Sequence, residues 1–344
     1  MSLLLEILIT LLVLSVLVIG HEFGHYAAGR LLKFDILEFA VGMGPRLCGF
    51  KKKGIEYNLR LLPIGGMCRF SGEDETTSEE GSFRAKAAWK RAVVVFAGPF
   101  MNFVLAFVIS MILYMGWGTY DPGRVIVQSL NVNGPAETAG LLPGDELTAV
   151  NGARIDSIES LSNGLNSGDP GRVTITVLRG GEQKEYTFAP VFDETEQKQM
   201  IGVTITNPIV KDSFFAAVPH SLRFCWEMGT IVFKSLGMLF TGEAGLNDMS
   251  GVVGVTRIVG EAASYGMDML LTLCVMLSMN LGIMNLLPVP ALDGGRLFFI
   301  LVEMVRRKPV PAEKEGLVHL IGLALLMVLM IYLVVHDITV WVGA

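Results

Sequence analysis

The chain has 344 residues, of which 51% are hydrophobic and only 17% are charged, whereas soluble domains have about 25% charged residues. Its net charge is −6 and it has no basic stripe interleaved with aromatic residues, so nucleic acid is set aside as a partner. The four cysteines form no CxxC pair, which implies neither a thiolate zinc knuckle nor a disulfide framework. The composition is that of a membrane protein.

Four apolar stretches are long enough to cross a bilayer, which takes about 20 residues. The first has no basic n-region and no small-residue cleavage site, so we expect a retained helix and not a secretory signal. The sequence therefore predicts a polytopic α-helical membrane protein. Its four transmembrane helices are expected at residues 3–28, 92–117, 269–287 and 317–335.

Lys and Arg near the ends of membrane helices stay in the cytoplasm, and their distribution predicts the orientation. Segment 26–91 holds twelve of the 27 Lys and Arg residues, and segment 294–316 adds five, whereas the longer region between 117 and 269 holds ten. We therefore expect both termini and the large central region to be extracytoplasmic.

The segment after the first helix reads as a β-hairpin or small sheet. "RLCGF" and "IEYNLRLLPIGGMCRF" flank a turn signal at residues 51–54. Strand backbone is tolerated at membrane depth only where protein or a water-filled cavity satisfies its polar groups. The hairpin is therefore expected to re-enter the membrane and to lie against the helices.

The chain changes character at the turn signal Asp121-Pro122-Gly123, after which short alternating strands and a helix over 157–165 predict an inserted soluble α+β domain. Residues 208–240 have the pattern of an amphipathic interfacial helix, and the Gly-rich segment 241–260 is expected to be a loop. The predicted organisation has three regions. The membrane core consists of residues 1–117 and 269–344. Residues 123–206 form the inserted domain, and residues 207–268 form the interfacial region.

The motif HEFGH places His21 and His25 four residues apart, so that on a helix both imidazoles face one side and can bind a single Zn²⁺. Glu22 lies beside that metal and can move a proton between water and a leaving amine. The other reading is a polar cluster that only ties helices together. Ionisable residues inside a membrane are costly without partners, which favours a functional site.

A catalytic zinc ion takes three protein ligands and keeps one position open. Asp293 is the leading candidate for the third ligand, because "NLLPVPALDGGR" lies at the cytoplasmic end of the third predicted span, at the depth expected for HEFGH. Pro288 and Pro290 interrupt the helix, and Gly294-Gly295 permits a close approach of chain to metal. A helix-capping role for Asp293 is the alternative.

These motifs resemble the site-2 protease family of intramembrane metalloproteases, in particular its bacterial RseP type. HEFGH, NLLPVPALDGG and AGPFMN (Ala97 to Asn102) look like the motifs of three of its helices, and the hairpin looks like its membrane-reentrant sheet. The inserted domain is similar to a PDZ domain in "GPAETAGLLPGDELTAVNG". RseP-type proteins of proteobacteria carry two such domains, whereas this chain has room for one.

The resemblance implies zinc ligands at His21, His25 and Asp293 and a catalytic acid/base at Glu22. It also implies substrate contacts at Asn285, Asn280, Gly65 and Gly66. The side-chain amide of an asparagine can donate a hydrogen bond to a developing oxyanion. The alternative for Asn285 is a helix cap or a hydrogen bond between helices.

The resemblance also implies regulated intramembrane proteolysis in a bacterial inner membrane. The substrates would be single-span proteins such as anti-sigma factors or remnant signal peptides, trimmed first by a site-1 protease, with the PDZ-like domain as a filter. Two other classes stay open, namely a non-catalytic membrane adaptor and a membrane-anchored protease of misfolded soluble chains.

Overall fold

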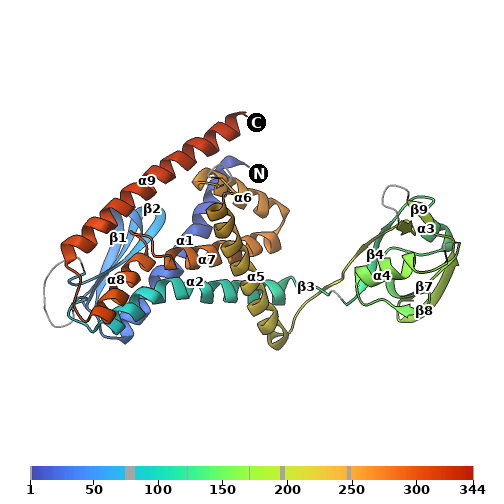
Figure 1. Cartoon of the computed structure of the whole chain (residues 1–344), viewed down its shortest axis with the longest axis horizontal. Helices are drawn as coiled ribbons and strands as arrows, with labels where there is room; N and C mark the ends of the chain where they lie inside the picture. Colours follow the sequence, from blue (N-terminus) through green and yellow to red (C-terminus); the bar gives the residue numbers. More distant parts are fainter. Residues whose placement is uncertain are drawn as a thin grey trace. The chain divides into compact units, whose positions relative to one another are not determined.

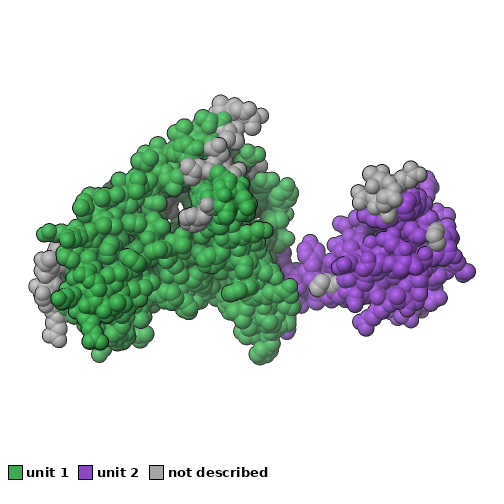
Figure 2. Space-filling view, in the orientation of Figure 1, with its two compact units in different colours: residues 1–113, 214–344 green, residues 114–213 purple. Residues whose placement is uncertain are grey.

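The computed structural model describes residues 2–73, 82–121, 123–169, 171–193, 198–245 and 249–343. The chain divides into two compact units (Figure 2). Unit 1 combines residues 1–113 with 214–344, and unit 2 is the inserted segment 114–213.

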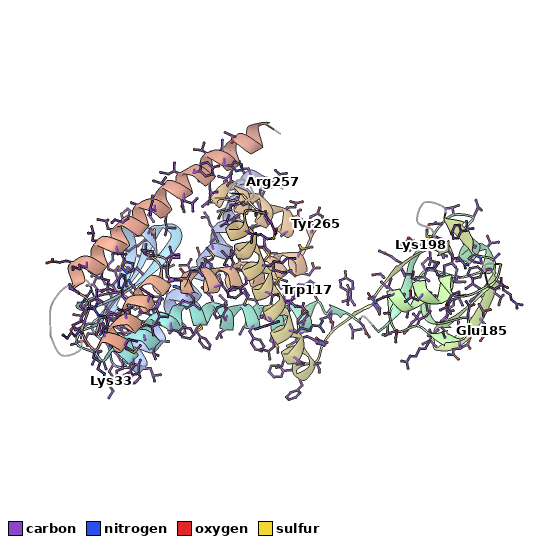
Figure 3. All side chains as sticks on the ribbon, viewed as in Figure 1. Lys33, Trp117, Glu185, Lys198, Arg257 and Tyr265 are labelled. Atoms are coloured by element: carbon purple, nitrogen blue, oxygen red, sulfur yellow. The ribbon has the colours of Figure 1, made fainter. Side chains whose placement is uncertain are left out.

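Among the residues that the structure describes, four helices are long and apolar enough to cross a membrane, which agrees with the predicted number of spans. They are α1 (Leu3–Leu31), α2 (Ala88–Gly116), α7 (Met267–Leu286) and α9 (Ala312–Gly343). Trp117 directly follows α2 (Figure 3). The outer faces of these helices are apolar: Leu12 is 65% exposed and Val328 is 65% exposed. Exposed apolar surface on this scale is suited to lipid and not to water.

The helices pack around a core of small and branched side chains. Leu17 of α1, Ala106 of α2 and Val275 of α7 are each at most 1% exposed. Val259 joins them from a further helix, α6 (Val252–Tyr265). The expectation of a loop over 241–260 is therefore wrong from residue 252 onward. That helix is capped by a distant residue, because the Asp337 carboxylate accepts hydrogen bonds from the amides of Gly251 and Gly254 at 3.2 and 2.8 Å.

The predicted amphipathic helix is α5 (Phe214–Thr241), and the segment after the proline-interrupted loop forms α8 (Asp293–Arg306). Figure 1 shows α8 beside the β-strands that follow α1. No helix was predicted at α8, because it is short and lies in a segment rich in Lys and Arg that reads as a connection between two spans.

The re-entrant segment is a pair of long strands, β1 (Ile36–Lys52) and β2 (Ile55–Phe70). β1 begins ten residues before the predicted "RLCGF". Its residues 38–41 pair with 66–69 on one side and with 56–59 on the other, so the hairpin folds over into a small sheet. Within the described residues, 66–69 has no second strand partner. The backbone groups on this edge are therefore available to pair with another extended segment.

A second core fixes the sheet to the helices. Phe34, Ile36 and Phe70 are each at most 5% exposed and pack with Val94 of α2 and Ile300 of α8. This cluster holds the sheet, α2 and α8 together around the segments that carry the candidate site.

Unit 2 is an α+β domain with a six-stranded sheet in the order β11-β4-β5-β7-β8, with β6 beside β5. Two helices accompany the sheet, α3 (Pro135–Ala139) and α4 (Ile158–Asn166). The second corresponds to the helix predicted over 157–165, and in the structure it begins with a capping box between Ser157 and Ser160. The strands are β4 (Val125–Leu130), β5 (Glu146–Val150), β6 (Ala153–Arg154), β7 (Val173–Arg179), β8 (Glu182–Phe188) and β11 (Val203–Thr206). Short strands β3 (Thr119–Tyr120), β9 (Val191–Asp193), β10 (Lys198–Met200) and β12 (Ile209–Val210) complete the unit.

Unit 2 has its own hydrophobic core. Alternate residues of β7, namely Val173, Ile175 and Val177, are at most 1% exposed and pack with Val125 of β4 and Leu161 of α4. Period-two burial along a strand is the pattern that predicted a sheet with one buried face.

Candidate metal centre

Two histidines on α1 face the same point. His21 and His25 are four residues apart, and their Nε2 atoms lie 3.2 Å from each other because residues at this spacing lie on one helical face. The side chains of both are mostly buried, with 12% and 11% exposed. Two ring nitrogens that point at each other in a buried site suit a shared cation.

Asp293 joins the histidines from another helix. Its Oδ2 atom lies 3.0 Å from Nε2 of His21 and 3.3 Å from Nε2 of His25. In a tetrahedral zinc site with bonds of about 2.0–2.1 Å, neighbouring ligand atoms lie about 3.3–3.4 Å apart. The three separations are close to that value. The three residues form a cluster that could hold a metal ion.

The buried Oδ2 atom of Asp293 has no aligned hydrogen-bond donor in the described part of the chain, although two ring nitrogens lie beside it. Buried carboxylate oxygens are costly without a donor or a metal. The donor set therefore fits zinc by ligand type, by separation and by an otherwise unsatisfied oxygen.

Glycines at the start of α8 allow Asp293 to reach the histidines. A Cβ atom on Gly294 would lie 2.1 Å from the carbonyl oxygen of Leu287, and one on Gly295 would lie 2.5 Å from that of Val289. The close approach is thus of α8 to the preceding loop, and not of Gly294-Gly295 to the metal position. Ala291 in that loop has a left-handed φ of 76°.

His319 of α9 supports this strained loop by accepting a hydrogen bond from the Ala291 amide at 2.8 Å. The sequence had offered no role for His319, because its partner is a backbone amide 28 residues away. A backbone contact of this kind leaves no pattern in the sequence.

Helix α2 passes directly behind the histidines. A Cβ atom on Gly98 would lie 2.2 Å from Nε2 of His25, and Gly24 of α1 approaches the Ala97 carbonyl as closely. The Nδ1 atom of His25 lies 2.9 Å from the Val94 carbonyl oxygen. These contacts explain why "AGPFMN" has a glycine at its second position, since any larger residue would occupy the place of the imidazole.

Glu22 lies between the histidines and the edge of the small sheet. It lines a cavity of about 410 Å³ together with His21, His25 and Asp293. A Cβ atom on Gly66 would lie 2.7 Å from Cγ of Glu22, so the free strand edge packs directly against this side chain. The cavity therefore brings a candidate metal, a carboxylate and an open strand edge to one place.

Of the four predicted substrate-binding residues, two line the cavity and two do not. Asn285 and Gly66 line the same cavity. Gly65 packs instead on Met43, where its φ of 81° suits glycine. Asn280 is exposed on α7 and is not among the residues that line the cavity.

Several residues that line the cavity or lie behind the histidines were not found from the sequence. Cys68, Glu73 and Arg296 also line it, and Glu73 forms an ion pair with Arg296. Asn102 lies behind His21, with its Nδ2 atom 3.2 Å from Nδ1 of His21. Only Asn102 had a signal, because it ends the AGPFMN motif.

Comparison with known proteins finds a family model and several relatives that match nearly the whole chain. Residues 9–329 match Peptidase family M50. A protein of Clostridium acetobutylicum is 35% identical over 335 residues, which cover 97% of each chain. The zinc metalloprotease RasP of Shouchella clausii is 32% identical over 409 aligned positions, covering 95% of this chain and 97% of RasP. RasP of Geobacillus kaustophilus is 30% identical over 407 aligned positions, which cover 95% of this chain and 96% of that protein.

A solved structure also resembles part of the chain. The PDZ domain of an SdrC-like protein from Listeria monocytogenes is 26% identical, and the match covers 25% of this chain and 90% of that domain with a TM-score of 0.22.

The fold and the matching relatives define a multi-pass membrane metalloprotease. The chain belongs to peptidase family M50.

Proposed function

We propose that this protein is an intramembrane zinc metalloprotease that hydrolyses peptide bonds within the transmembrane segments of single-span proteins. The observation that carries the proposal is the convergence of His21, His25 and Asp293 beside Glu22 in one cavity bordered by a free strand edge. The zinc assignment is supported by the donor set and by the name of the RasP relatives.

The strand edge gives a physical route for presenting a helical substrate. A peptide bond in a transmembrane helix is shielded by its own hydrogen bonds, so the segment must unwind before it is cut. Among the described residues, 66–69 have a strand partner on one side, and they line the cavity. A substrate added as an extended strand there satisfies its backbone groups and brings a carbonyl group to the site.

The chain's own residues then account for proton movement. A bound zinc ion supplies Lewis-acid activation of water and of the scissile carbonyl. Glu22 takes a proton from the attacking water and delivers it to the amine nitrogen as the C–N bond breaks. We assign to Asn285, which lines the cavity, the donation of an amide N–H to the oxygen on which charge develops.

We further propose the arrangement expected from the sequence, with a membrane core in residues 1–117 and 269–344 and an interfacial region in 207–268. The termini and the inserted domain are extracytoplasmic in a bacterial inner membrane, and the site lies toward the cytoplasmic side. The distribution of Lys and Arg supports this orientation. Cysteine labelling of single-cysteine variants from either side of the membrane tests it.

The inserted domain is proposed to exclude substrates that still carry bulky extracytoplasmic domains, so that an upstream site-1 protease must act first. Deleting 123–206 should then permit cleavage of an untrimmed reporter. A matched variant with a folded domain of similar size in place of 123–206 should restore exclusion. Unchanged selectivity after deletion contradicts the filter and leaves the protease activity intact.

The experiment that tests the function is cleavage of a tagged single-span reporter by the purified protein in lipid vesicles. Wild-type protein should shift the reporter to a smaller size, while Glu22→Gln should bind zinc normally and cleave at least about 10²-fold more slowly. His25→Ala should lose both zinc and cleavage. Cleavage by Glu22→Gln at the wild-type rate rejects the mechanism, and no cleavage by any variant favours an adaptor.

A further inference from the structure

Both histidines of the metal centre contact α2 through their second ring nitrogen. Nδ1 of His25 lies 2.9 Å from the carbonyl oxygen of Val94, and Nδ1 of His21 lies 3.2 Å from the side-chain amide of Asn102. Residues 94, 98 and 102 are spaced by four and follow one side of the helix. One helix therefore supplies the outer contacts of both imidazoles.

The chemistry of the metal decides which of these nitrogens carries a proton. A neutral imidazole binds metal through its unprotonated nitrogen, and its other nitrogen is then an N–H that needs an acceptor. For His25 the acceptor is the Val94 carbonyl, which cannot act in any other way. For His21 the partner is a carboxamide, which has one accepting end and one donating end.

Asn102 is held in a place where its orientation matters. Its side chain is fully buried, and its Oδ1 atom has no hydrogen-bond partner among the described residues. Its backbone carbonyl accepts a hydrogen bond from the Ser278 hydroxyl of α7 at 2.8 Å, which fixes α2 at this level. The two ends of a carboxamide have nearly the same shape, so the oxygen and nitrogen can exchange places without moving the backbone.

We propose that Asn102 is a positioning residue for His21. With Oδ1 turned toward His21, it accepts the Nδ1 hydrogen, leaves Nε2 unprotonated toward Asp293 and fixes the plane of the ring. This inference rests on the proposed zinc site, and it assigns to AGPFMN two tasks: Gly98 gives room for His25, and Asn102 selects the tautomer of His21. Outer contacts of this kind change metal affinity by about 10–100-fold.

The test is zinc affinity of the purified full-length protein, measured by competition with a chromogenic chelator. Asn102→Leu keeps the size of the side chain and removes the acceptor, so we expect zinc affinity to fall about 10–100-fold. Asn102→Asp can only accept from Nδ1, and we expect its affinity to stay within about threefold of wild type. Ser278→Ala, which removes the neighbouring backbone contact alone, is the matched control and should also keep its affinity.

A second readout separates positioning from packing. The visible spectrum of Co²⁺-loaded protein reports ligand geometry, and it should change for Asn102→Leu and be retained for Asn102→Asp. Wild-type affinity in the Leu variant, or equal losses in the Leu and Asp variants, overturns the proposal. If Asn102→Leu does not fold, the Asp variant decides alone, since a large loss of affinity there rejects the acceptor role.

The measurement does not depend on proteolysis. If the reporter is not cleaved but zinc affinity follows the acceptor, the proposed function fails and the role of Asn102 stands. If the reporter is cleaved and zinc affinity ignores the acceptor, only the role of Asn102 fails.

Discussion

Gly98 of α2 and His25 of α1 approach so closely that a single added carbon on Gly98 would lie 2.2 Å from the Nε2 atom of the histidine. The same helix contacts His25 again through the Val94 carbonyl, 2.9 Å from Nδ1. The position of the imidazole is therefore determined by α2 as much as by the helix that carries it.

Replacing Gly98 with alanine should displace the His25 ring and remove most of the bound zinc, together with cleavage of the reporter. Zinc in the purified protein is measured by atomic absorption. Gly116→Ala is the matched control, because Gly116 ends the same helix and has no atom within 4 Å of an added Cβ. Full zinc occupancy in Gly98→Ala would contradict the close packing of α2 on the ligand.

Replacing Gly66 with alanine should slow cleavage and leave zinc in place. The added Cβ would lie 2.7 Å from Cγ of Glu22, so it displaces the proposed acid/base without touching a proposed zinc ligand. Cleavage rate and zinc content measured on the same preparation separate this result from that of Gly98→Ala. Loss of zinc from Gly66→Ala would show that the strand edge supports the metal ligands and not Glu22 alone.

The Asp145–Arg179 pair should make the stability of the inserted domain depend on pH. Burial works to raise the pKa of the Asp145 carboxyl, but hydrogen bonds from Arg179 at 2.6 Å and from the Leu142 amide outweigh it, and the net pKa is lowered. A folded pKa below the unfolded value, about 3.9, adds stability above that pH. This stability is lost as the pH falls from about 5 through the folded pKa.

Asp145→Asn should therefore lower the free energy of unfolding of residues 114–213 by about 2–3 kcal/mol at pH 7 and remove much of its acid dependence. Urea unfolding at pH 7 and pH 3 measures both effects. Glu182→Gln is the control, because Glu182 is 78% exposed and its ion pair with Lys184 is long, at 3.8 Å. Equal acid dependence in wild type and Asp145→Asn would argue against the pair.

Asp337→Ala should loosen the first turn of α6. The Asp337 carboxylate accepts hydrogen bonds from the amides of Gly251 and Gly254, and loss of a helix cap costs about 1 kcal/mol. A loss of about 1 kcal/mol corresponds to about a fivefold change in the opening equilibrium, so hydrogen exchange at residues 251–255 should become about fivefold faster. Ile338→Ala, at a neighbouring exposed position of α9, should leave this exchange unchanged.

The membrane class, the four spans and the inserted domain followed from the sequence alone. Each depends on a local pattern: long apolar runs for helices 3–31 and 88–116, and alternation for strands such as 173–179. Such patterns are readable because they reflect contacts of a segment with one uniform surrounding, either lipid or a single buried face. The pair His21 and His25 was readable for the same reason, since helical periodicity places them together.

Only the tertiary structure decided which distant groups meet. It brought Asp293 to within 3.3 Å of both histidines, placed Asn102 behind His21, seated Glu22 against Gly66 and left Asn280 on an exposed face. It also replaced an expected loop by α6, whose cap comes from Asp337. These contacts join residues up to 272 positions apart, and they depend on packing between helices and on backbone carbonyls. Neither of these leaves a periodic signal in the chain.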